Sequence, residues 1–193
     1  MAILGIDVGG TGMKGALVDT ETGELLSERF RLDTPKKRDP EGMAQCFNEI
    51  VKHFDYKGPI GAGFPTIIKN GVCGSQGNLH KSWKGLNVSE VFSQETGLPV
   101  IVVNDADAAG YATMQYGVGQ GEMGLVIMIT IGTGIGSGAF FNGELIPNVE
   151  LGQIPYKNYK RIEEWVSASA KERDGLSLEQ WAERFNKFLK ILD

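Results

Sequence analysis

The chain has 193 residues, of which 41% are hydrophobic and 22% are charged, and its formal net charge is −5. This composition is that of an ordinary globular protein with enough apolar residues for a core. The acidic balance argues against a nucleic-acid binder, because binding to phosphate backbones needs many Lys and Arg residues on one face. No apolar run approaches the roughly 20 residues that a bilayer requires, and the start carries no targeting signal. We therefore expect a cytoplasmic protein that binds neither nucleic acid nor membrane.

The two cysteines, Cys46 and Cys73, stand far apart and form no Cys-x-x-Cys pair. This spacing predicts neither a zinc site nor a disulfide framework.

A glycine-rich loop follows the first apolar run, in ILGIDVGGTGMKGALVD, with Gly10, Gly12 and Gly15 at the spacing of a dinucleotide-binding turn. Such a turn must lead into a helix, whose N-terminus binds the pyrophosphate. Here an apolar run, a turn at Thr22-Gly23 and an alternating segment from residue 26 to 32 follow instead, which indicates strands. The loop therefore joins two strands of an antiparallel hairpin.

Exposed backbone N–H groups in this loop, with Lys14 nearby, suit a phosphate group. Asp7, at the end of the first strand, is placed to hold Mg²⁺ through water. The alternative is a glycine-rich tight turn without a ligand, because glycine is the usual residue of such turns.

A second set of polar residues follows a later strand. Residues 40 to 56 have helical spacing after Pro40, PIGAGFP indicates a short strand, and a small helix is expected to end at Gly97. The β-branched run Val100 to Val103 then predicts a buried parallel strand before a helix. Asn104 and Asp105 would lie at the carboxyl end of that strand, where open α/β sheets place ligands. Asp105 could alternatively cap the helix.

The second half repeats the plan of the first. LVIMITIGTGIGSGAFFNGELI predicts a strand, a glycine loop, and a strand that ends in the hairpin turn Asn142-Gly143. Two such units predict two lobes that face each other over a shared phosphate, one spanning residues 1–105 and the other 106–193.

The C-terminal segment from Tyr159 is predicted to be helical in two pieces, split at Asp174-Gly175. Ser177 and Gln180 form a capping box, and the last helix carries one apolar stripe. The stripe consists of Trp181, Phe185, Phe188, Leu189 and Leu192.

Taken in order, these motifs resemble the ROK sugar kinases of the actin-like ATPase superfamily. IDVGGTGMKGALVD, NDADAAG and TIGTGIGSG carry the resemblance, and NLHKSWKGLN with NGELIPNVELG is most similar to the bacterial polyphosphate glucokinases within that family. The resemblance implies an α/β, actin-like (ribonuclease H-like) fold of two lobes.

The resemblance also implies roles for individual residues. Asp105 would be the catalytic base. The first phosphate loop would consist of Asp7, Gly9, Gly10, Thr11 and Lys14, and the second of Gly132, Thr133, Gly134 and Gly136. The sugar would contact Asn78, Asn104, Asp105, Glu150, Gln153 and Glu163.

Three departures from the family pattern stand out. Gln153 replaces the histidine of the Glu-x-Gly-His motif; it can still hydrogen-bond a hydroxyl but cannot ligate zinc as imidazole does. The cysteine cluster that holds zinc in many members is missing. The chain also stops at Asp193, inside an amphipathic helix, so we expect an incomplete second lobe whose uncovered apolar stripe promotes association or poor folding. We also expect no efficient activity, because an unfinished lobe cannot hold Gly132 to Gly136 in fixed register with Asp7 to Lys14.

The expected reaction is phosphoryl transfer, with Mg²⁺, from polyphosphate or ATP to the 6-hydroxyl of glucose. A homodimer is expected. Polyphosphate would need a basic track, for which Lys36, Lys37 and Arg38, or Lys81 and Lys84, are candidates; solvated surface charge is the alternative. A sugar-binding or regulatory protein without turnover, or an inactive remnant, is the alternative function, and the regulator is disfavoured because only Met1 to Leu4 precede the first loop.

Overall fold

The computed structural model describes residues 1–192, and its contacts divide the chain into two compact units, Met1–Gln120 and Gly121–Asp193, each treated by itself below. The lobe boundary predicted after Asp105 falls inside the first unit and stays a prediction. Among the described residues, no helix has the length and apolar character needed to cross a membrane.

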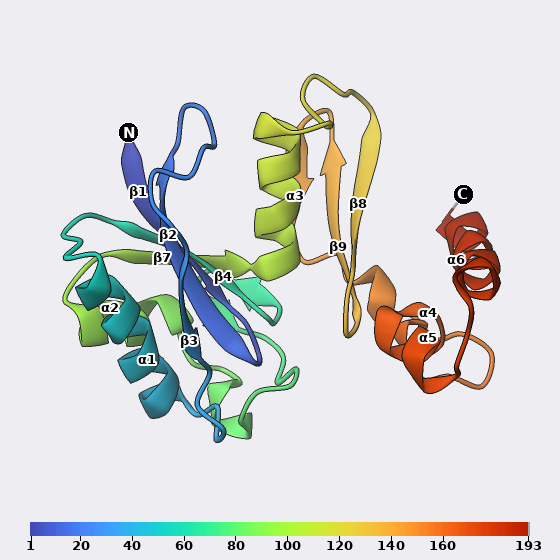
Figure 1. Ribbon diagram of the computed structural model, residues 1–193, viewed down its shortest axis with the longest axis horizontal. Helices are drawn as coiled ribbons and strands as arrows, with labels where there is room; N and C mark the ends of the chain where they lie inside the picture. The colour runs from blue at the N-terminus through green and yellow to red at the C-terminus, as the bar shows by residue number, and fades with distance from the viewer. Residues whose placement is uncertain (193) are drawn as a thin grey trace. The chain divides into compact units, whose positions relative to one another are not determined.

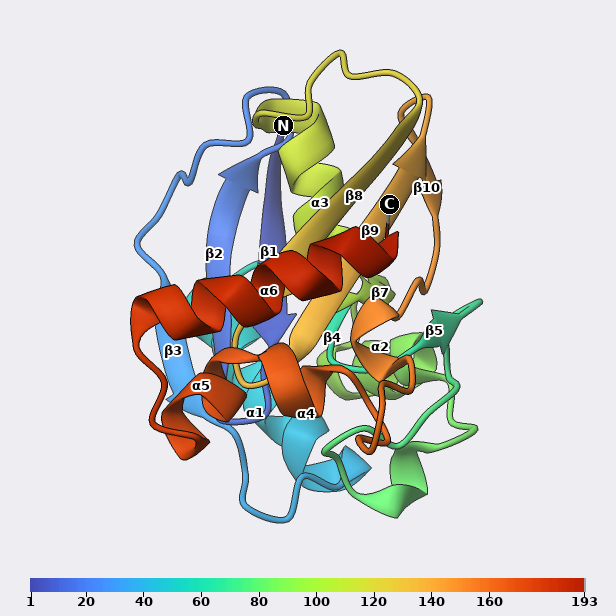
Figure 2. The ribbon, with the colours of Figure 1, turned by 90° about the vertical axis from the view of Figure 1, so that its right-hand side faces the viewer.

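The first unit contains a five-stranded sheet in the order β3-β2-β1-β4-β7 (Figures 1 and 2). Its strands are β1 (Ala2–Val8), β2 (Gly12–Asp19), β3 (Phe30–Asp33), β4 (Ile60–Phe64) and β7 (Val100–Asn104). The predicted hairpin is confirmed, because β1 and β2 pair antiparallel with Asp7 opposite Lys14. β1, β4 and β7 are parallel, so their carboxyl ends share one edge of the sheet. A short hairpin of β5 (Ile68–Lys69) and β6 (Val72–Cys73) forms a separate ribbon.

Helices cover both faces of this sheet, with α1 and α2 on one face and α3 on the other (Figure 1). They are α1 (Pro40–His53), α2 (Val88–Thr96) and α3 (Asp105–Tyr116), and a short 3-10 helix, η1 (Lys81–Trp83), precedes α2. Helix α1 begins as predicted, with Pro40 in its first turn and Asp39 accepting the amide of Gly42. Helix α2 ends at Gly97, whose φ of 69° is readily adopted only by glycine.

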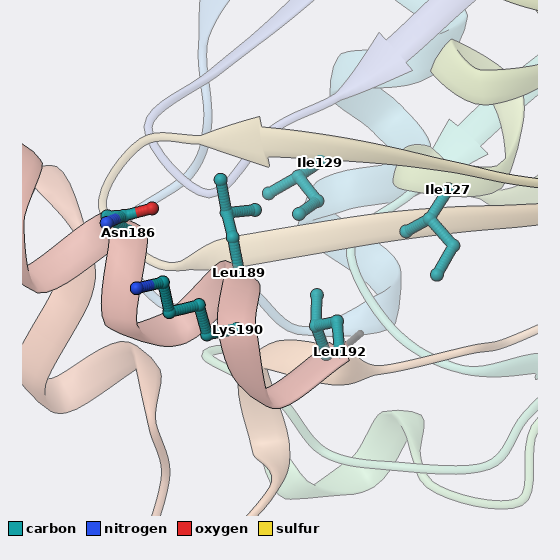
Figure 3. A pocket seen from close by; sticks show the side chains of 6 residues that line it. All are labelled: Ile127, Ile129, Asn186, Leu189, Lys190 and Leu192. Atoms are coloured by element: carbon teal, nitrogen blue, oxygen red, sulfur yellow. The ribbon is translucent and has the colours of Figure 1, made fainter.

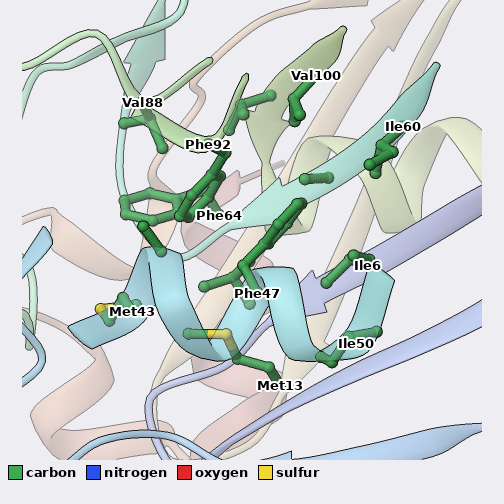
Figure 4. Packing of buried hydrophobic residues seen from close by; sticks show 14 of the residues in the cluster. Ile6, Met13, Met43, Phe47, Ile50, Ile60, Phe64, Val88, Phe92 and Val100 are labelled. Carbon is green, nitrogen blue, oxygen red and sulfur yellow. The ribbon is translucent and has the colours of Figure 1, made fainter. Parts of the chain in front are cut away.

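The core of the first unit lies between the sheet and helices α1 and α2 (Figure 4). Phe47 of α1 stacks on Phe92 of α2 with ring centroids 4.2 Å apart, and Phe64 and Trp83 pack edge-on around them. All four side chains are fully buried, so this aromatic cluster fixes the strand ends relative to the helices.

Two strand predictions for the first unit need correction. The alternating segment predicted from residue 26 pairs regularly only over β3, which begins at Phe30. Strand β7 is parallel as predicted, but it lies at the edge of the sheet and only one of its faces is buried. Val100 and Val102 join the core, whereas Ile101 is 69% exposed.

The second unit contains an antiparallel sheet in the order β10-β9-β8, with β8 (Leu125–Ile131), β9 (Ile135–Phe141) and β10 (Glu144–Ile146). The predicted turn at Asn142-Gly143 is confirmed, and both residues have positive φ (51° and 82°), as a type I′ hairpin requires. The 3-10 helix η2 (Leu151–Gln153) and the helices α4 (Glu163–Val166), α5 (Ala168–Arg173) and α6 (Leu178–Leu192) follow.

Helix α6 packs against the rest of the second unit (Figure 2), so the expectation of an uncovered stripe is largely wrong. Phe188 is fully buried against Ile135, Ile162 and Val166, and Phe185 and Leu192 pack on the same cluster. The capping box is confirmed, because Ser177 and Gln180 exchange hydrogen bonds of 2.9 and 3.2 Å.

A shallow pocket of about 440 Å³ remains between α6 and β8, lined by Ile127, Ile129, Asn186, Leu189, Lys190 and Leu192 (Figure 3). Before α6, the predicted break at Asp174 is present. Arg173 and Arg184 both pair with the Asp174 carboxylate and lower its pKa to about 2.

Candidate functional site

The first glycine loop, Gly9 to Thr11, connects β1 directly to β2 and leads into no helix. This connection rules out the dinucleotide-binding turn, which needs a helix N-terminus. The loop is tight, because the Gly9 amide donates to the Gly12 carbonyl at 3.2 Å and a Cβ on Gly9 would lie 2.6 Å from that oxygen.

Thr34, which follows β3, restrains this loop through two hydrogen bonds. Its hydroxyl donates to the Gly9 carbonyl at 2.6 Å, and its amide donates to the Thr11 carbonyl at 3.2 Å. Because both bonds use loop carbonyls, Thr34 constrains the loop without occupying its backbone N–H groups. Sequence reasoning missed Thr34, which carries no local signal beyond its place at the end of a strand.

Asp7 and Asp105 lie near each other where the parallel strands end. Asp7 of β1 stands opposite Gly63 of β4, and a Cβ on Gly63 would lie only 3.4 Å from the Cα of Asp105, the residue after β7. Burial raises the pKa of Asp105, and the negative charges of Asp7 and Asp107 raise it further, against the opposing hydrogen bond from the Ala106 amide. A carboxylate in this setting is a better proton acceptor than an exposed one.

Asn104 supplies the cap of α3. Its Oδ1 accepts the amides of Ala106 and Asp107 at 2.9 and 3.0 Å, and its Nδ2 donates to the Thr66 carbonyl at 3.1 Å. The side chain is 4% exposed. The alternative in which Asp105 is the N-cap is therefore wrong, since Asp105 is the first residue of the helix. Asn104 fixes the backbone from which the Asp105 carboxyl projects.

Lys14 and Asp7 form an ion pair of 3.0 Å beside the first loop, and both side chains are about half exposed (41% and 54%). Among the described residues, no three His, Cys, Asp or Glu side chains gather as a metal cage. Mg²⁺ does not need such a cage, because it keeps several waters and binds through one or two carboxylates and substrate phosphates. The half-exposed Asp7, close to Asp105, fits that mode of binding.

The second glycine loop, Gly132 to Gly134, connects β8 to β9, and Gly136, which was predicted to belong to the loop, lies in β9 opposite Thr130. The Gly132 amide donates to the Gly134 carbonyl at 3.0 Å, and the Gly132 carbonyl accepts the amide of Ala168 at 3.1 Å. The loop is therefore fastened to the start of α5, which sequence reasoning did not predict.

Glu163 connects this loop to the predicted sugar-binding residues of the second unit. Its Oε2 accepts the Ile135 amide at 3.1 Å, and its Oε1 accepts Gln153 Nε2 at 3.2 Å and pairs with Arg161 at 2.7 Å. Oε2 lies so close to Gly134 that a Cβ there would be 2.4 Å away. Gln153 and Glu163, both predicted to contact the sugar, thus lie together, and Arg161, which no sequence motif indicated, lies beside them.

Glu150 precedes η2, and Ser137 of β9 hydrogen-bonds the backbone of the residues on either side of it. The Ser137 hydroxyl donates to the Val149 carbonyl and accepts the Leu151 amide at 2.9 Å. Gly152 packs against β9 so tightly that a Cβ would lie 2.2 Å from the Ile135 carbonyl. The glycine of the Glu-x-Gly-Gln motif therefore places both Glu150 and Gln153 beside the exit of the second loop.

Asn78 lies in an exposed loop of the first unit, where its carbonyl accepts Arg38 Nη1 at 3.0 Å. The roles predicted for Asn78, for the other sugar contacts and for the phosphate loops stay predictions.

An α/β fold with glycine loops after β1 and β8 and an Asp at the end of β7 is the arrangement of the actin-like sugar kinases. The chain belongs to the ROK family, whose model matches residues 3–152. The resemblance inferred from the sequence is thereby confirmed, as is the actin-like fold class.

Among known proteins, the polyphosphate glucokinase of Mycobacterium tuberculosis (strain ATCC 25618 / H37Rv) is 41% identical over 190 residues, which cover 98% of this chain and 71% of that protein. That of Mycobacterium leprae is 36% identical over 98% of this chain and 58% of its own length. The structure of the inorganic polyphosphate/ATP-glucomannokinase from Arthrobacter sp. strain KM matches 99% of this chain and 78% of its own, with a TM-score of 0.93 and 41% identity. The structure of a ROK family glucokinase from Streptomyces griseus, in complex with glucose and AMPPNP, is also similar. The match covers 90% of this chain and 59% of that chain, with a TM-score of 0.78 and 28% identity.

Proposed function

We propose that this chain transfers a phosphoryl group from polyphosphate, ATP or both to the 6-hydroxyl of glucose and forms glucose 6-phosphate. The observation that carries the proposal is Asp105, a largely buried carboxyl near Asp7 at the strand ends, next to a tight glycine-rich hairpin loop. The similarity to polyphosphate glucokinases supports the choice of sugar and donor.

In this reaction the sugar hydroxyl oxygen forms a bond to the terminal phosphorus while the bond from that phosphorus to the rest of the donor breaks. Asp105 accepts the hydroxyl proton, and the shortened donor leaves with the electron pair of the broken bond. The transition state is loose, so most of the catalysis is positioning and neutralisation of phosphate charge. The loop amides and Lys14 perform this neutralisation on the protein side.

Asp7 would hold Mg²⁺ through water, and the ion would supply further neutralisation of phosphate charge. Glu150, Gln153 and Glu163 would accept or donate hydrogen bonds to sugar hydroxyls. Glu163 already uses three of about four acceptor positions on its carboxylate, so it has room for one hydroxyl. Asn104 would act mainly by holding Asp105, because its carbonyl oxygen already accepts two amides.

The test combines a coupled assay for glucose 6-phosphate with calorimetric measurement of glucose binding. With either donor, Asp105→Asn should lower the rate by about 10² to 10⁴ and leave glucose binding nearly unchanged, because Asn keeps the shape but accepts no proton. Glucose binding without turnover of any donor by the unmodified chain would instead support the sugar-binding or regulatory alternative. Wild-type turnover in Asp105→Asn would refute the assignment of the base.

A further inference from the structure

Two basic segments that are separate in the sequence lie together on the first unit. Lys36, Lys37 and Arg38 precede α1, and Lys81 and Lys84 lie in and just after η1. We call these five residues the basic surface. The four lysines are exposed, and the one acidic residue within residues 34–40 and 76–89 is Asp39, which pairs with Lys37. This concentration of positive charge occurs in a chain whose net charge is −5.

The fold holds the two segments together through Arg38. Its carbonyl accepts Trp83 Nε1 at 2.9 Å and the His80 amide at 3.3 Å, and its guanidinium donates to the Asn78 carbonyl at 3.0 Å. Arg38 has a φ of 52°, a conformation that is costly for a residue with a side chain. Such strain persists where surrounding contacts enforce it, and here the fully buried Trp83 does so.

The basic surface is continuous with the first glycine loop. Thr34 hydrogen-bonds both Gly9 and Thr11 of that loop, and Lys36 follows only two residues later, within about 7 Å along the chain. Arg31 also reaches the loop, since its Nη2 donates to the Thr11 carbonyl at 3.4 Å. Basic side chains therefore extend from the loop across the start of α1 to η1, with Arg31 paired with Asp33 and Lys37 paired with Asp39.

We propose that the basic surface binds the internal phosphates of a polyphosphate chain whose terminal phosphate occupies the first glycine loop. This inference rests on the proposed function. A donor with three phosphates would be held at the loop, whereas a long polyanion would continue onto the lysines. Lysines suit such a ligand, because point charges on flexible stems follow a mobile chain of phosphates without requiring a fixed geometry.

The experiment compares Lys81→Ala/Lys84→Ala with the control Lys52→Ala/Lys57→Ala. Both double variants remove two exposed lysines from the same unit, but Lys52 lies at the far end of α1, about 20 Å of helix from Lys37. Binding of long-chain polyphosphate, inorganic tripolyphosphate and ATP is measured by calorimetry at several salt concentrations, and KM is measured for each donor that supports turnover.

For Lys81→Ala/Lys84→Ala we expect the affinity for long-chain polyphosphate to fall about tenfold and to depend less steeply on salt, because fewer counterions are released on binding. Tripolyphosphate and ATP should bind as to the unmodified chain, and the control should behave as the unmodified chain with every ligand. Equal losses in both double variants, or no loss in either, would overturn the inference.

Two further outcomes would also overturn it. An equal loss for tripolyphosphate would place the lysines at the loop itself, and equally tight binding of single-stranded DNA would make the surface a general polyanion site. Failure of the proposed function is distinguishable from failure of this inference. It would appear as absence of turnover with every donor, whereas the role of the lysines is decided by the binding measurements alone.

Discussion

Glu163 is expected to hold the second glycine loop in place, and replacing it should loosen that loop more than it weakens the whole protein. Glu163→Ala removes the acceptor of the Ile135 amide, whose residue is 2% exposed. A buried amide left without an acceptor costs about 1 to 3 kcal/mol. The other two bonds add little, because Gln153 is exposed and Arg161 is 47% exposed and still pairs with Glu164.

The assay is hydrogen exchange of the Ile135 amide in the folded chain. At about 1.4 kcal/mol for each factor of ten, the expected loss corresponds to exchange that is about 5 to 150 times faster. Glu163→Gln should give a smaller effect, because one amide oxygen can still accept the Ile135 N–H.

The neighbouring residue offers a matched control. Glu164 also pairs with Arg161, at 3.0 Å, but among the described residues its carboxylate makes no hydrogen bond to the loop. Glu164→Ala removes the same charge from the same turn of α4 and should change stability by less than about 1 kcal/mol, as expected for an exposed ion pair. Equal exchange rates at Ile135 in the two alanine variants would refute the role assigned to Glu163.

Three further predictions concern the two units separately. Asp105→Asn should be more stable than the unmodified chain at neutral pH, because burial raises the folded-state pKa of Asp105 above the ordinary 3.8 and makes the ionised carboxylate costly. In thermal melts the difference in stability between the two proteins should shrink as the pH falls through the raised pKa. A difference that stays constant with pH would contradict this cause. Gly9→Ala should destabilise the first unit by about 1 to 3 kcal/mol in urea unfolding, since its Cβ would meet the Gly12 carbonyl, whereas Gly10→Ala meets no atom within 4 Å and should have no steric cost. The Asp174 carboxyl should titrate near 2 by NMR, and the stability that its two arginine partners contribute should be present above the unfolded-state pKa and lost as the pH falls toward 2; titration near 4 would show that these pairs do not persist in solution.

Features set by a few adjacent residues were predictable from the sequence. The start of α1 at Pro40, the end of α2 at Gly97 and the turn at Asn142-Gly143 each depend on a local backbone preference that one or two residue types satisfy. The capping box at Ser177 likewise needs only a partner three residues away.

Features that depend on distant partners were not predictable in the same way. The run Val100 to Val103 is apolar enough for a strand buried on both faces, yet β7 lies at the sheet edge, and no property of the run itself gives its place in the strand order. Similarly, Asp105 follows a strand as a capping residue often does, but the cap is Asn104, whose amide also finds the distant Thr66 carbonyl.

The two glycine loops share a requirement that glycine alone cannot meet. Glycine permits a loop to expose its amides but also leaves the loop free to adopt other conformations, so a fixed anion site needs a second element that restrains it. Thr34 restrains the first loop through Gly9, which lies 25 residues earlier in the sequence. Glu163 restrains the second loop through Ile135, which lies 28 residues earlier. A carboxylate beside an anion site would repel phosphate, which a threonine hydroxyl does not. In the phosphate-binding role proposed for the second loop, the Arg161 guanidinium, 2.7 Å from Glu163, would offset that charge, as Lys14 would offset the charge of Asp7 beside the first loop.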